Sequence, residues 1–98
     1  MVNMYQDKKE SPNAVTRVQT GVRIEKRILK VMKAVAEYHD ITLGDLIEGV
    51  VLHAFEGKCA FGAESLKRIG ELKNIYHLDL TSGDSHKLTE RHAGKRAR

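Results

Sequence analysis

The chain has 98 residues, the length of one small domain, and a domain of this size buries a smaller share of its surface than a larger one. Its single cysteine, Cys59, excludes an internal disulfide. The first ten residues carry four charges and no apolar stretch, so we expect no signal peptide. No apolar run in the sequence is long enough to span a bilayer. These features predict a cytoplasmic protein.

Positive charge is concentrated in two places. The chain holds 17 Lys and Arg against 13 Asp and Glu, a formal net charge of +4. Residues 17–33 contain six basic side chains and one acidic one, and residues 91–98 contain four more basic side chains and no acid. Such clustering favours a polyanionic ligand, nucleic acid first and an anionic membrane second. The alternative is an ordinary solvated charged surface.

The first structural element in the chain is a predicted short strand. Residues 1–14 indicate a flexible arm, and in residues 17–24 apolar and polar side chains then alternate with a period of two. A lone strand leaves its backbone groups unpaired, so we expect a second copy of the chain to pair with it. One face would hold Val18, Thr20, Val22 and Ile24, and the other Arg17, Gln19, Gly21 and Arg23.

Three helices are predicted after the strand. Apolar side chains with helical spacing predict helices over 25–39, 43–56 and 63–76. Thr42 and Asp45 form a capping-box pattern at the start of the second helix, and Gly57 is expected to end it. The predicted fold class is therefore mainly α with one short strand. The expected segments are a flexible arm (1–14), a core (15–57), a C-terminal helical extension (58–80) and a basic, partly disordered tail (81–98).

Three short segments, Thr20–Ile24, Glu25–Leu29 and Ile41–Ile47, resemble the ribbon-helix-helix family of DNA-binding proteins, which includes the Arc, methionine and plasmid copy-number repressors. The resemblance covers residues 17–57. It implies an intertwined homodimer in which two strands, one from each copy, form an antiparallel ribbon that enters the major groove of double-stranded DNA.

The resemblance also implies a role for individual residues. Gln19 and Arg23 would read base edges, with Arg17 beside them, because arginine can pair with guanine and glutamine with adenine through two hydrogen bonds each. Phosphates would be bound by the start of the second helix and by the first residues of the helix before it. The phosphate-binding set is Lys26, Arg27, Thr42, Leu43 and Gly44, and the dimer core is Val18, Val22, Ile24, Leu46, Ile47, Val50 and Val51.

The expected function is that of a transcriptional repressor or regulator that needs no cofactor. Association of dimers into a higher-order complex on DNA stays open. Two alternatives stay open: an antitoxin-like module that binds a partner protein through residues 58–98, and an accessory protein for plasmid transfer or partition. We expect no metal site, because His77, Asp79, Asp84 and His86 match no ligand spacing. We expect no enzyme, because the Asp84-Ser85-His86 sequence lacks a glycine-rich elbow.

Overall fold

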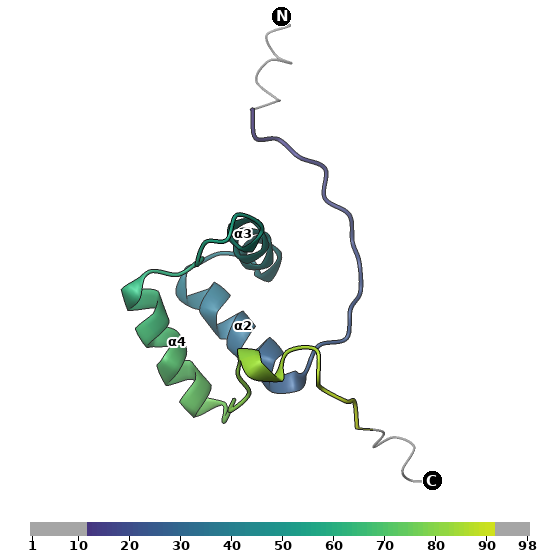
Figure 1. Cartoon of the computed structure of the whole chain (residues 1–98). Coiled ribbons are helices and arrows are strands. Elements are labelled where there is room, and N and C mark those ends of the chain that lie inside the picture. The colour runs from purple at the N-terminus through teal and green to yellow at the C-terminus, as the bar shows by residue number, and fades with distance from the viewer. Residues whose placement is uncertain (1–11, 92–98) are drawn as a thin grey trace, which may run out of the picture.

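The computed structural model describes residues 12–91 as three helices and one short 3-10 turn. Helix α2 spans Lys26–Tyr38, α3 spans Leu43–Phe55, α4 spans Ala63–Ile75, and η1 spans Ser82–Asp84. Helix α2 lies between the other two and packs against both (Figure 1). None of the helices in this range is long and apolar enough to cross a membrane.

The three predicted helices are confirmed, each to within one residue at either end. Local signals explain this agreement. The Glu25 carboxylate accepts a hydrogen bond from the Ile28 N–H at 2.9 Å and caps α2. The Thr42 hydroxyl accepts from the Asp45 N–H at 3.1 Å and caps α3 in the same way.

Each of the three helices is followed, two positions after its last residue, by a residue with left-handed backbone geometry. Gly57 follows α3 with φ +70°, and the N–H of Lys58 donates to the His53 carbonyl at 2.8 Å, which completes a Schellman motif. The predicted stop at Gly57 is therefore confirmed. Asp40 and His77 take the same position after α2 and α4, with φ values of 59° and 58°.

The core of the described chain is small and centred on α2. Four side chains are buried, at 4–8% exposure, and none is below 2%. Three of the four belong to α2 and one to α3, so α2 supplies most of the buried surface. The four residues are Val31, Val35, Ala36 and Leu46.

The C-terminal extension folds back onto α2. The Arg68 guanidinium of α4 lies 5.2 Å from the centre of the Tyr38 ring, and Leu78 packs against the core. At η1, the Thr81 N–H donates to the Asp84 carboxylate at 2.8 Å, and the Thr81 hydroxyl accepts from the Gly83 N–H at 3.2 Å. Residues 81–91 of the predicted basic, partly disordered tail therefore include one short helical turn, η1, and residues 92–98 lie outside the described range.

The predicted strand, and with it the predicted fold class of a ribbon-helix-helix with an intermolecular ribbon, is wrong. Residues 12–91 contain no β-strand. Residues 14–24 instead run as an exposed, extended segment alongside the helices (Figure 1). Alternation of side chains predicts which side chains share a face, but a strand also requires a neighbouring backbone to accept and donate hydrogen bonds, and no part of residues 12–91 supplies one. Most of the predicted flexible arm, residues 1–11, lies outside the described range.

Replacement of Gly57 by Ala should destabilise the protein by about 1 kcal/mol, because a Cβ is strained at positive φ. No heavy atom lies within 4 Å of that Cβ position, so the cost comes from the backbone alone. Gly70→Ala, in the open interior of α4, is the matched control and should stabilise by up to about 1 kcal/mol. Urea unfolding measures the free energy of unfolding of both variants. A change of the same sign in both would contradict a conformational requirement for glycine at position 57.

Candidate nucleic-acid interface

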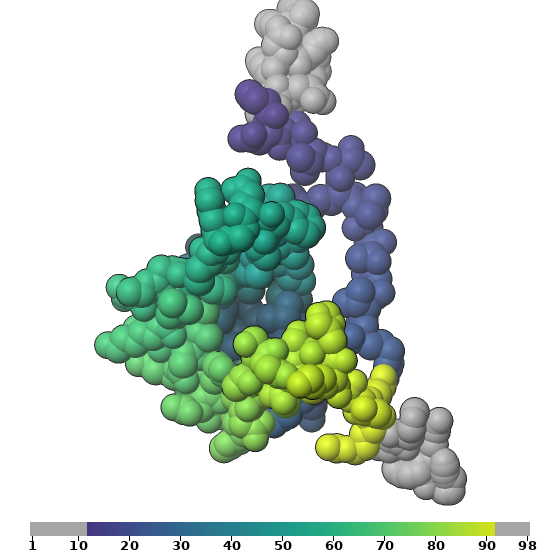
Figure 2. Space-filling view, in the orientation of Figure 1, coloured from purple at the N-terminus to yellow at the C-terminus, as the bar shows by residue number. Residues whose placement is uncertain are grey.

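The extended segment before α2 presents most of its side chains to solvent. Val15, Val18 and Val22 are 70%, 81% and 73% exposed, and Gln19 is exposed as well. In Figure 2 the segment, coloured purple to blue, stands off the body of the molecule along much of its length. The three predicted base-reading residues of this segment, Arg17, Gln19 and Arg23, are all exposed.

Arg17 connects the extended segment to α3 through an ion pair with Glu48. Its Nε and Nη2 atoms donate to the two carboxylate oxygens of Glu48, each at 2.7 Å. This hydrogen-bonded pair lowers the pKa of Glu48 from its ordinary value of 4.5. Asp45, one turn earlier on α3, also acts electrostatically on Arg17. Arg17 thus lies near the first turns of α3, where the sequence predicts phosphate binding.

Arg23 pairs with the C-terminal segment. Its Nε donates to one carboxylate oxygen of Glu90 at 3.1 Å, and its Nη2 donates to the other. The pair joins residues that are 67 positions apart in the chain. Both side chains stay largely exposed, so the pair contributes at most a small amount to stability and can open.

Arg27, predicted to bind phosphate, has three partners in the folded chain. Its Nε donates to Glu25 at 2.9 Å, and its Nη1 donates to Asp79 at 3.0 Å and to the His77 carbonyl at 3.1 Å. Arg27 therefore ties the end of the extension to the start of α2. Lys26, the neighbouring predicted phosphate ligand, is exposed.

The first turn of α3 is open to solvent at the residues predicted to meet a phosphate. Thr42 and Gly44 are exposed, and Leu43 is half-buried. A Cβ built at Gly44 meets no heavy atom within 4 Å, so a ligand can approach the backbone closely there. The positive end of the helix dipole favours an anion at this position, whereas the Asp45 carboxylate in the same turn opposes one.

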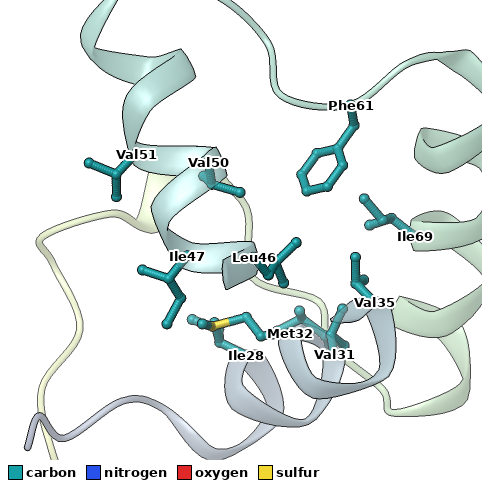
Figure 3. Close-up of a pocket in the computed structure, with 11 residues that line it drawn as sticks. Ile28, Val31, Met32, Val35, Leu46, Ile47, Val50, Val51, Phe61 and Ile69 are labelled. Carbon is teal, nitrogen blue, oxygen red and sulfur yellow. The ribbon is translucent and has the colours of Figure 1, made fainter. Parts of the chain in front are cut away.

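An apolar hollow of about 300 Å³ lies beside these charged elements (Figure 3). It brings together the four α3 residues of the predicted dimer core, but Val18, Val22 and Ile24 do not line it. Every side chain in its wall is apolar. From α2 these are Ile28, Val31, Met32 and Val35, from α3 Leu46, Ile47, Val50 and Val51, and from the extension Phe61, Ile69 and Leu78.

The predicted dimer core contained neither the four α2 residues of the wall nor the three residues from the C-terminal side, Phe61, Ile69 and Leu78. In Figure 3, Phe61 and Ile69 form the wall of the hollow opposite Val50. Ile69 belongs to the apolar stripe of α4, which was a usable signal. Phe61 and Leu78 lie outside the helices, and only the tertiary fold reveals that they join the hollow.

Two acidic residues near the C-terminal side of the described chain have structural partners. Asp79 binds Arg27 and Asp84 caps η1. In the part of the chain that the structure describes, no group of three or more His, Cys, Asp or Glu side chains is placed to hold a metal ion.

Comparison of the chain with protein-family models, with curated proteins and with solved structures found no match. The functional interpretation therefore depends on the geometry and chemistry of the residues described above.

The Arg17–Glu48 pair predicts a measurable titration. The pKa of Glu48 should lie below 4.5, and Arg17→Met should raise it, because the guanidinium stabilises the carboxylate. Since the folded pKa is depressed, the contribution of the pair to stability is present above the unfolded pKa and is lost as the pH falls through the folded one. Carboxyl ¹³C chemical shifts across an acid titration measure the pKa.

The matched control is Arg27→Met, which removes a guanidinium that pairs with other carboxylates. It should leave the Glu48 titration unchanged. An equal rise in both variants would show that net charge, and not the Arg17 contact, sets the pKa.

Proposed function

We propose that the protein binds double-stranded DNA sequence-specifically as a homodimer and acts in the cytoplasm as a transcriptional regulator, most simply a repressor. The observation that carries the proposal is the exposed extended segment, which presents Gln19 and Arg23 beside a basic helix start. These two side chains have the donors that recognise purine edges in the major groove.

The charge around the segment supports this function. Lys26, Lys30 and Lys33 are exposed on α2, immediately after the segment. Lysines of this kind bind phosphates without reading sequence, and each contact they make steepens the salt dependence of binding. A surface that combines base-reading and phosphate-binding side chains suits DNA better than a membrane, which offers no base edges.

The start of α3 supplies the second phosphate contact of the proposal. A phosphate can approach the exposed Gly44 backbone closely, and the Arg17–Glu48 pair holds the extended segment near the same helix. One phosphate at this helix start would fix the position of the segment on the duplex. Such contacts set register, while Gln19 and Arg23 select the bases.

A protein-binding module is the second candidate function, and exposed apolar side chains in the extension favour it. Leu66, Ile75 and Leu88 are 49%, 63% and 49% exposed. A partner protein that covers them would fit an antitoxin-like chain. The role of an accessory protein in plasmid transfer or partition uses the same DNA contacts and has no distinguishing feature in the structure.

Selection of binding sites from random double-stranded DNA at two salt concentrations tests the proposed function. We expect enrichment of one motif with two inverted half-sites, since a two-fold symmetric dimer presents its reading surface twice. Arg23→Ala should weaken binding to the selected site about tenfold or more and weaken binding to random DNA less.

Lys33→Ala is the matched control for charge, because it removes one exposed positive side chain from α2. It should weaken binding to selected and random DNA equally. No enrichment at either salt concentration would overturn the proposed function, and equal losses for Arg23→Ala on both DNAs would remove Arg23 as a base reader.

Replacement of Gly44 by Ala separates the phosphate contact from helix stability. The added methyl group meets open space in the free protein, so stability should stay unchanged or rise by up to about 1 kcal/mol. Affinity for the selected DNA should fall several-fold, because the methyl group keeps the phosphate from the backbone. Urea unfolding and fluorescence anisotropy measure the two quantities.

Gly70→Ala on α4 again serves as the control, since its Cβ also meets open space. It should leave the DNA affinity unchanged. Unaltered DNA binding by Gly44→Ala would contradict a close phosphate approach at α3.

A further inference from the structure

Helix α3 is apolar on more sides than its own chain covers. Between residues 46 and 55 it carries one charged side chain, Glu48, and one histidine. Among the helices of residues 12–91, α2 is the one against which the α3 backbone packs closely. A helix that is apolar nearly all round is buried in its functional state, so α3 requires a second covering surface.

The uncovered part of α3 forms one continuous stripe. Ile47, Val51 and Phe55 are spaced four residues apart and therefore share a face. Their exposures are 37%, 37% and 79%. Leu52, at 63% exposure, lies beside them. The first two residues of the stripe line the apolar hollow, and Phe55 lies outside it.

The hollow and the stripe are complementary and belong to the same chain. The hollow has an entirely apolar wall, and Phe55 is the most exposed aromatic side chain among the described residues. A two-fold axis near the middle of α3 would run two copies of this helix antiparallel and place the Phe55 end of each beside the Ile47 end of the other. Both apolar surfaces would then be covered at once, as an isologous interface requires.

We propose that a second copy of this chain occupies the hollow, with its Phe55 ring as the anchor and with Phe61, Ile69 and Leu78 of the extension as the outer wall. This inference rests on the homodimer of the proposed function, and it needs no strand pairing. It assigns the C-terminal extension to the dimer interface. Aromatic anchors in apolar pockets carry much of the binding free energy of protein interfaces.

The small core of the single chain supports a second copy as the occupant. Only four described side chains are buried, and a domain of this length gains stability from extra apolar burial. A different protein that filled only the hollow would leave Leu52 and Phe55 of this chain exposed. Self-association covers both surfaces with one contact.

Sedimentation equilibrium of the full chain tests the interface. The wild type should be a dimer, and Phe55→Asp should weaken dimerisation about 100-fold, because the charge would enter an apolar pocket. Phe55 is mostly solvent-exposed in the single chain, so this variant should keep its helical circular dichroism. The matched control is Leu66→Asp, an exposed leucine on α4 that does not line the hollow and should leave the dimer intact.

A second measurement locates the contact. In mixed dimers of one unlabelled and one ¹³C-methyl-labelled copy, nuclear Overhauser effects should connect the Phe55 ring of one copy with Ile69 or Leu78 methyl groups of the other. A dimer that lacks these effects and tolerates Phe55→Asp would overturn the inference, and selected DNA binding by that same dimer would leave the proposed function standing. A wild type that stays monomeric at all concentrations would overturn the inference and the homodimer together.

Discussion

The apolar stripe of α2 is the constraint on which the rest of the structure depends. Val31, Val35 and Ala36 face inward from this one helix, and α3 and α4 pack on either side of it. The C-terminal extension also returns to α2, where Leu78 packs against the core and Arg27 donates two hydrogen bonds to the returning chain. Loss of the α2 stripe would release both neighbouring helices.

Sequence reasoning succeeded where the determining signals are local. Caps at Glu25 and Thr42 and the stop at Gly57 lie within a few residues of the helix ends that they determine, so the three helices were predicted closely. The left-handed stops at Asp40 and His77 were not predicted, because these residue types do not mark such geometry as glycine does. The strand failed for a different reason, since its formation depends on a partner backbone.

The candidate interface was partly predictable on the same physical grounds. Residue chemistry identified Gln19 and Arg23 as candidate base readers, and both are exposed. The alternation did not separate two faces, because Val18 and Val22, predicted to face a core, are exposed as well. The neighbours of the candidate base readers were not foreseeable, because the Arg23–Glu90 pair closes a loop of 67 residues and the hollow joins two helices to residues beyond them. Contacts between residues so far apart in sequence depend on the tertiary fold, and no periodic pattern of residues in the sequence indicates them.

The pairing of the exposed arginines alters how a DNA ligand would be selected. Arg23 already donates two hydrogen bonds to Glu90. A guanine edge would therefore have to replace the Glu90 carboxylate as the acceptor of these bonds. An exposed pair of this kind contributes little to stability, so a two-bond guanine contact can replace it. A base with poorer hydrogen-bond acceptors would not displace Glu90 from Arg23. The Glu90 carboxylate would thereby compete with weak DNA sites for the guanidinium.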